Sequence, residues 1–179
     1  MLNTDMKHSF PYKLIDTLDN SILEKFKVWV IHQTYHQVED FTDYTIKSSK
    51  SLNDYNIFKN LYDVHLSKFF DLSGHLTSNI ARMNPNCYYP EHADYTGIKL
   101  GNSQDSIIKL QIPIITNPAA GLMWRHNPEN QSACVSLKEG GIYVFDNCRI
   151  HSSVNFSDEY RYWLTSRWHK DSLLDLSLL

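Results

Sequence analysis

The residues best suited to chemistry lie in two short segments, 88–94 and 148–151. His92 and Asp94 are two residues apart, and on an extended strand side chains at that spacing point to the same face. His151 follows His92 by 59 residues, which is enough chain for several intervening strands and their turns. Two imidazoles and one carboxylate on one side of an ion form the facial arrangement of non-haem Fe(II) sites. The spacing therefore predicts a metal site made by His92, Asp94 and His151.

A purely structural role for the same residues stays open. His92 fits a buried core histidine, and Asp94 fits a turn cap because Tyr95-Thr96-Gly97 follows it. Three features favour the metal site instead: the pair lies among β-type segments, a histidine follows on a late strand, and Arg161 comes ten residues after that histidine. A guanidinium at that position suits a bound dicarboxylate, because its fork of donors matches carboxylate geometry.

Length and composition set the broad class. A chain of 179 residues buries most of its apolar surface in a single core, and 42% hydrophobic with 21% charged residues is ordinary for a globular protein. The formal charge of −3, with no basic block, indicates no nucleic-acid partner. No apolar run reaches the roughly 20 residues of a membrane span, and the N-terminus has no secretory signal pattern. Three cysteines without a CxxC pair indicate reduced thiols and a cytoplasmic protein.

Periodicity divides the chain into a helical first part and a β-rich second part. The pattern predicts a short edge strand over 11–16, a helix over about 21–36 and a polar loop over 37–53. A second helix is expected from about residue 53 to Gly74, with its inward side chains being Ile57, Leu61, Val64, Leu66, Phe69 and Phe70. From residue 76 onward, short apolar runs alternate with turn residues, as in antiparallel sandwiches and barrels.

The β-rich part predicts seven or eight strands. They are expected at 76–83, 88–95, 106–116, 122–125, 133–137, 142–145, 149–155 and 160–168. In the third of these, Ile108, Leu110, Ile112 and Ile114 share one face, whereas Lys109, Gln111 and Pro113 share the other. Helices that precede a run of strands favour an α+β, mainly β class. The fold expected is a double-stranded β-helix, a cupin-like jelly roll, with the N-terminal helices packed on one sheet.

The predicted organisation is one domain over 1–179. It consists of a helical buttress and loop (1–75), a jelly-roll core (76–168) and a C-terminal tail (169–179). The leucine-rich tail is expected to form a short helix that caps the domain or meets a partner.

Several segments between about 76 and 168 resemble the aspartyl/asparaginyl β-hydroxylase-like oxygenases. The segments that show the resemblance are Ile108-Lys109-Leu110-Gln111-Ile112-Pro113-Ile114-Ile115-Thr116-Asn117, Glu139-Gly140-Gly141-Ile142-Tyr143-Val144-Phe145-Asp146-Asn147 and His151-Ser152-Ser153-Val154-Asn155. Arg161 then follows at the spacing which that family uses. The likeness implies an enzyme dependent on Fe(II), 2-oxoglutarate and O2, with His92, Asp94 and His151 as iron ligands and catalytic residues.

By the same resemblance, Arg161 pairs with the distal carboxylate of 2-oxoglutarate. Lys109 stands where the family usually has a second arginine, and Gln111 stands where a histidine that contacts 2-oxoglutarate is common. An ammonium group neutralises a carboxylate but lacks the bidentate fork of a guanidinium. The co-substrate site is therefore expected to include Arg161, Lys109 and Gln111, with Lys109 departing from the family pattern.

The reaction expected is hydroxylation of a C–H bond of an amino acid or an amino-acid side chain, with release of succinate and CO2. Free-amino-acid hydroxylases of the family usually keep the carboxylate ligand, so Asp94 favours a small-molecule substrate over a protein side chain. Two other interpretations stay open. One is a jelly-roll metal-dependent hydrolase or isomerase using the same ligands. The other is a non-catalytic binding module in which these residues are structural.

Overall fold

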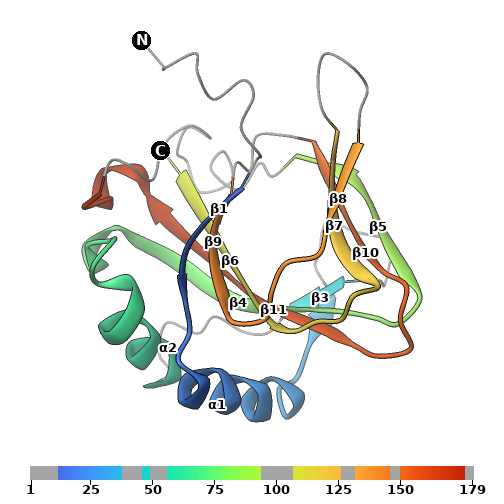
Figure 1. The fold of residues 1–179 in the computed structure, drawn as a ribbon. Helices are drawn as coiled ribbons and strands as arrows, with labels where there is room; N and C mark the ends of the chain where they lie inside the picture. The colour runs from blue at the N-terminus through green and yellow to red at the C-terminus, as the bar shows by residue number, and fades with distance from the viewer. Residues whose placement is uncertain are drawn as a thin grey trace.

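Two antiparallel sheets face each other in the protein (Figure 1). The structure is a computed structural model and describes residues 12–37, 46–48, 56–93, 107–125, 132–145 and 150–175. The larger sheet has seven strands, in the spatial order β1 (Tyr12–Thr17), β9 (Gly141–Phe145), β6 (Ile107–Ile115), β11 (Arg161–His169), β4 (His75–Met83), β3 (Ile46–Ser48) and β2 (His36–Gln37). The smaller sheet has four, in the order β5 (Cys87–His92), β10 (His151–Asn155), β7 (Ala120–Arg125) and β8 (Ser132–Val135).

The chain passes repeatedly from one sheet to the other. From β4 to β7 it alternates between the larger and the smaller sheet, and after the β7–β8 hairpin it alternates again through β9, β10 and β11. This winding is that of a double-stranded β-helix. The jelly-roll fold expected from the sequence is therefore confirmed, including its eight strands after residue 74.

The described helices cover the outer face of the larger sheet (Figure 1). Helix α1 (Asn20–Ile31) buries one stripe of side chains, Ile22, Leu23, Phe26 and Val30. Helix α2 (Asn56–Leu61) continues into a π-helical turn over Tyr62–Leu66, and short 3-10 turns follow at Leu72–Gly74 and Lys170–Ser172. No helix in the described ranges is long and apolar enough to cross a membrane.

The two faces of the larger sheet have different compositions. On β6 the alternate residues Ile108, Leu110, Ile112 and Ile114 belong to the main core, together with α1 and α2. The residues between them face the smaller sheet, as period-2 alternation requires. Leu122 and Trp124 of β7 pack there against Tyr143 and Phe145 of β9, which shows that this inner face is enclosed by both sheets.

Helix α1 ends five residues earlier than predicted. The backbone leaves the helical conformation at His32 (φ −98°, ψ 0°), and the chain then turns into β2. Tyr35, which extended the apolar pattern, packs against Tyr162 of β11 with ring centroids 5.8 Å apart, and its hydroxyl donates to the carbonyl of Val30 at 2.7 Å. Tyr35 is thus half-buried by tertiary packing from outside the helix. The predicted loop 37–53 also contains β3, which pairs with β2 and β4.

The predicted start of the second helix, near residue 53, lies outside the described residues, and the buried face of the described part differs from the prediction. The described part starts at Asn56, and its π-helical turn is closed by the Ser67 amide donating to the carbonyl of Tyr62 at 2.8 Å. Because the extra residue in a π turn rotates the following side chains, Val64 is 49% exposed instead of buried. His65 takes the buried position, where its Nδ1 lies 2.9 Å from Oδ2 of Asp16.

Candidate active site

Sheet pairing brings the two predicted histidine ligands together. His92 ends β5 and His151 begins β10, and the two residues are direct partners in the antiparallel ladder. Their ring centroids are 4.4 Å apart, with the rings inclined at 48°. His151 is buried and His92 is half-buried, so this end of the smaller sheet presents two imidazoles side by side. Adjacent imidazoles of this kind suit a shared metal ion.

The tautomer of His92 follows from its neighbour. Its Nδ1 lies 2.9 Å from the carbonyl oxygen of Pro90, which accepts hydrogen bonds only, so Nδ1 carries the hydrogen. In the neutral ring the lone pair is then on Nε2, the nitrogen that ligates metal in such an arrangement. The ring is also held edge-on against Tyr89, with centroids 4.6 Å apart and planes 85° apart. Both contacts fix the orientation of the ring.

The predicted carboxylate ligand, Asp94, lies outside the described residues. Within the described ranges, no group of three His, Cys, Asp or Glu side chains is placed to hold a metal ion. The structure therefore describes two of the three predicted ligands and brings those two together. Asp94 remains a prediction from its position two residues after His92.

Arg161 is fully buried between the two sheets. It begins β11 on the inner face of the larger sheet, and its Nη1 donates to the carbonyl of Gly121 on β7 at 3.1 Å. Its Nε and Nη2 have no hydrogen-bond partner among the described residues. Burial lowers the pKa of Arg161 to about 10, so the guanidinium is still charged at neutral pH. A buried charge with orphaned donors is costly unless an anion satisfies it.

Arg161 contacts β7, the strand that pairs with the His151 strand β10. Gly121 is three residues along β7 from Trp124. Trp124 pairs with His151 of the neighbouring strand β10. Three residues of strand span roughly 10 Å.

Asn155 fixes the turn that joins the histidine strand to the arginine strand. Its Nδ2 donates to the carbonyls of Asn84 and Glu159, at 2.9 and 2.8 Å, and its Oδ1 accepts from the Ser157 hydroxyl at 2.9 Å. Asn155 is completely buried. These bonds set where Arg161 starts relative to His151.

The other two predicted co-substrate residues lie on the inner face of β6. Gln111 pairs with Thr165 of β11, and Lys109 pairs with Arg167, two residues farther from Arg161. Gln111 is buried and Lys109 is 8% exposed. The register thus places Lys109 beside Arg167 and not beside Arg161.

Trp124 is a site residue that the sequence analysis did not single out. It lies directly opposite His151 in the β7–β10 ladder and is 2% exposed. Its indole Nε1–H has no hydrogen-bond partner among the described residues, while its ring packs on Tyr12 and Phe145. Only strand pairing reveals this position, because Trp124 is distant from both histidines in sequence.

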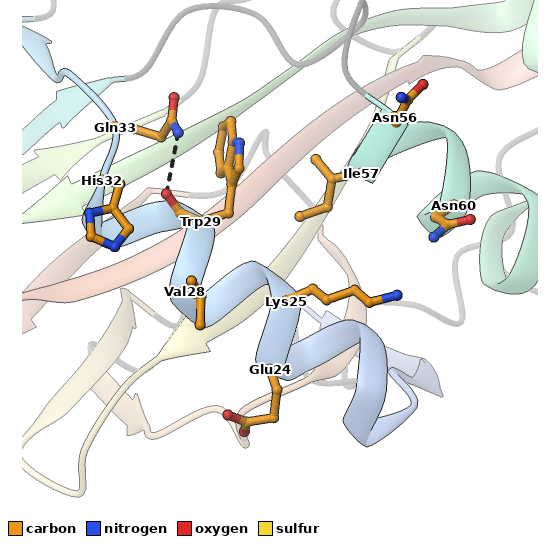
Figure 2. A pocket seen from close by; sticks show the side chains of 9 residues that line it. All are labelled: Glu24, Lys25, Val28, Trp29, His32, Gln33, Asn56, Ile57 and Asn60. Atoms are coloured by element: carbon orange, nitrogen blue, oxygen red, sulfur yellow. Dashed lines mark hydrogen bonds between the residues drawn. The ribbon is translucent and has the colours of Figure 1, made fainter.

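A separate groove of about 700 Å³ lies on the opposite side of the larger sheet, between α1 and α2 (Figure 2). Its wall includes Val28 and Trp29 from α1 and Ile57 from α2. The remaining lining residues are Glu24, Lys25, His32, Gln33, Asn56 and Asn60. The groove shares no residue with the His92–His151 pair and does not form part of this site.

Solved structures similar to this chain share its fold over most of its length. HygX from Streptomyces hygroscopicus, solved with nickel and 2-oxoglutarate bound, matches with a TM-score of 0.69 at 8% identity, covering 94% of this chain and 87% of that one. SnoK, a non-haem α-ketoglutarate-dependent carbocyclase from nogalamycin biosynthesis, gives 0.67 at 11% identity, covering 94% and 84%. A prolyl-4-hydroxylase from Pseudomonas putida gives 0.61 at 10% identity, covering 92% and 95%.

At these identities the likeness establishes the fold, and the fold is that of 2-oxoglutarate oxygenase structures. No protein-family model matches the chain, and no curated protein sequence matches it. The structural matches bring no support for the narrower aspartyl/asparaginyl β-hydroxylase-like branch that the sequence resembled.

Proposed function

We propose that the protein is an Fe(II)- and 2-oxoglutarate-dependent dioxygenase. The observation that carries the proposal is the fully buried guanidinium of Arg161, whose Nε and Nη2 have no partner among the described residues. Its partner Gly121 lies three residues, roughly 10 Å, along β7 from Trp124, which pairs with His151, and His151 in turn pairs with His92. A small dicarboxylate supplies what each end requires: a chelating group for the metal and an anion for the arginine.

His92 and His151 would hold the metal with Asp94 as the third ligand. Both histidines fit this role, since Nδ1 of His92 is committed to Pro90 and His151 is buried beside it. Bound Fe(II) supplies the activation of O2, coupled to oxidative decarboxylation of 2-oxoglutarate to succinate and CO2. Arg161 would bind the distal carboxylate, Gln111 would line the co-substrate site, and the enclosing sheets would exclude water.

The substrate proposed is an amino acid or a related small molecule that is hydroxylated at a C–H bond. Asp94 in the ligand position supports hydroxylation of a small molecule, by the resemblance noted above. A similar structure, HygX, has been solved with hygromycin B together with nickel and 2-oxoglutarate, so this fold accommodates small molecules beside the co-substrate.

Anaerobic reconstitution with Fe(II) and 2-oxoglutarate tests the proposal before any substrate is known. Wild type is expected to develop the weak visible charge-transfer band of metal-bound 2-oxoglutarate and, in air, to release succinate slowly. Asp94→Ala and His151→Ala are expected to lose the band, and Arg161→Met to require much more 2-oxoglutarate to reach it.

Lys138→Met is a matched control, because Lys138 is an exposed cation on the loop before β9. It is expected to behave as wild type. A wild-type protein that gives no band and no succinate, but binds zinc tightly, would contradict the oxygenase and favour a metal-dependent hydrolase or isomerase. A protein that binds no metal would favour a non-catalytic binding module.

A further inference from the structure

The indole of Trp124 is enclosed between the two sheets with no partner for its N–H among the described residues. The side chain is 2% exposed. It extends from β7 in the smaller sheet and packs on Tyr12 of β1 and Phe145 of β9 in the larger sheet, with ring centroids 5.4 and 5.2 Å away. An indole N–H can only donate, and a buried one usually finds an acceptor because it has lost its water.

A second buried tryptophan, Trp168, shows how the same donor is satisfied in the core. Trp168 is completely buried on the outer face of the larger sheet, and its Nε1 donates to the Ser166 hydroxyl at 2.8 Å. The two indoles are buried to nearly the same extent, but only the one in the core has an acceptor. Aromatic packing alone does not require the N–H of Trp124, because a phenylalanine ring stacks without a donor. The unpaired donor therefore indicates an acceptor that comes from a bound molecule.

Strand register places Trp124 beside the predicted metal position. Trp124 and His151 are direct partners in the antiparallel ladder, so their side chains leave the sheet on the same face, with Cβ atoms about 4.5–5.5 Å apart. His92 pairs with His151 from the other side. The order across the smaller sheet is thus His92, His151 and Trp124, and the indole flanks the imidazole pair on the side away from His92.

The same strand also holds the contact point of Arg161. The carbonyl of Gly121, which accepts from Nη1 of Arg161 at 3.1 Å, lies three residues before Trp124 on β7. A diacid that chelates a metal at His151 and places its other carboxylate at Arg161 would follow this part of β7. Trp124 is at the metal end of that path. Unpaired donors therefore occur at both ends, Nε1 of Trp124 at one and Nε and Nη2 of Arg161 at the other.

We propose that the indole N–H of Trp124 donates a hydrogen bond to the metal-proximal carboxylate of 2-oxoglutarate. This inference rests on the proposed oxygenase function and adds a binding residue at the chelating end of the co-substrate. A carboxylate oxygen suits the donor well, because hydrogen bonds to ionised acceptors are stronger than those between neutral groups. Arg161 and Trp124 then divide the recognition of the diacid, with one residue for each carboxylate.

Nuclear magnetic resonance of the indole N–H groups observes the donor directly, in the full-length protein loaded with Zn(II) in place of iron. The chain has four tryptophans, and the signal missing from Trp124→Phe identifies Trp124. Addition of 2-oxoglutarate is expected to move this signal downfield, as a new hydrogen bond to an anionic oxygen does. The signal of Trp29, from the groove on the opposite side of the larger sheet, is expected to stay in place. If Trp124→Phe does not fold, phenylalanine variants of the other three tryptophans assign the Trp124 signal by elimination.

Binding titrations then locate the contact on the co-substrate. Trp124→Phe keeps an aromatic ring and removes the donor, so the 2-oxoglutarate concentration that half-saturates the charge-transfer band is expected to rise roughly tenfold or more. The second probe is 2-oxobutyrate, which keeps the chelating end and lacks the distal carboxylate. With this probe the loss in Trp124→Phe is expected to persist, whereas the loss in Arg161→Met is expected to disappear. Trp29→Phe is the matched control and is expected to titrate as wild type.

Two outcomes would overturn the inference while leaving the oxygenase intact. One is a Trp124 signal that does not move with 2-oxoglutarate, together with a Trp124→Phe titration equal to that of wild type. The other is a loss in Trp124→Phe that disappears with 2-oxobutyrate, which would place the indole at the distal carboxylate. A wild-type protein that gives no charge-transfer band and no succinate would instead remove the proposed function and this inference with it.

Discussion

The two faces of the larger sheet are built from alternate residues of the same strands, yet one face is apolar and the other includes buried charged and polar side chains. On β6, Leu110 and Ile112 are completely buried under the helices, whereas Lys109 and Gln111 are nearly as buried on the other face. The outer face consists of apolar side chains packed on α1 and α2. The inner face includes two charged residues of β11, Arg161 and Arg167.

A buried side chain is therefore not always part of the hydrophobic core. A buried leucine contributes stability through the apolar surface it removes from water. A buried guanidinium with orphaned donors lowers the stability of the empty protein and becomes favourable only when an anion binds. The outer face therefore stabilises the fold through apolar burial, whereas Arg161 on the inner face carries a cost that a bound anion would offset.

The largest effect is expected from His151→Ala, compared with Val154→Ala on the same strand. The two residues are three apart and so face opposite sides of β10. His151→Ala is expected to abolish the Fe(II)–2-oxoglutarate band because it removes a metal ligand, while the melting temperature of the apoprotein changes little. Val154→Ala is expected to keep the band and lower the melting temperature. Iron analysis and thermal denaturation measure both, and a band that persists in His151→Ala would contradict the ligand assignment.

Leu110→Ala tests the outer face. Leu110 is fully buried in the core beneath the helices. Its truncation is expected to cost about 2–5 kcal/mol in the free energy of unfolding, because it removes apolar contacts and leaves a cavity. Denaturant titration measures the loss. Affinity for 2-oxoglutarate is expected to be retained, and a large loss of that affinity would show that the two faces are not independent.

Arg161→Met tests the inner face. Its expected effect on the free energy of unfolding is opposite in sign to that of Leu110→Ala. Methionine replaces the guanidinium by an apolar side chain that needs no hydrogen bonds, so the apoprotein is expected to be as stable as wild type or more stable by roughly 1–4 kcal/mol. The variant is expected to need a much higher concentration of 2-oxoglutarate for binding. Chemical denaturation of the metal-free protein is the measurement. Destabilisation comparable with that of Leu110→Ala would mean that Arg161 is structural.

A smaller effect concerns His75, which stacks on Phe58 of α2 with ring centroids 4.4 Å apart. Burial lowers the pKa of His75 from 6.5 to about 4. Between these values the unfolded chain binds the proton more readily, so stability falls as pH drops from about 6.5 to 4. His75→Phe keeps the aromatic stacking and removes this titration. The stability of this variant is expected to depend less on pH between about 6.5 and 4 than the stability of wild type does. An unchanged dependence on pH would contradict the lowered pKa of His75.

Much of the fold was predictable because local patterns report burial directly. The alternation of β6 identified its core face correctly, and turn residues separated the strands of the jelly roll at nearly the right positions. The helices were less predictable. The helix was predicted to reach Tyr35 but ends at Ile31, and Tyr35 packs instead against Tyr162 of β11, a strand from the far end of the chain. The π turn at Tyr62–Leu66 likewise shifted which residues face inward.

For the site, the sequence by itself determined the candidate residue types, namely two histidines, a nearby carboxylate and a following arginine. Parity alone did not separate Arg161 from Arg167, because both lie on one face of the same strand. The ten-residue spacing from His151 favoured Arg161, and the tertiary structure shows what the spacing does not, that Arg161 is enclosed completely against Gly121 of the opposite sheet. Strand pairing likewise placed His92 against His151 and Lys109 against Arg167. The reason is physical: periodicity records which face a side chain takes, whereas register and the packing of two sheets fix which distant side chains meet.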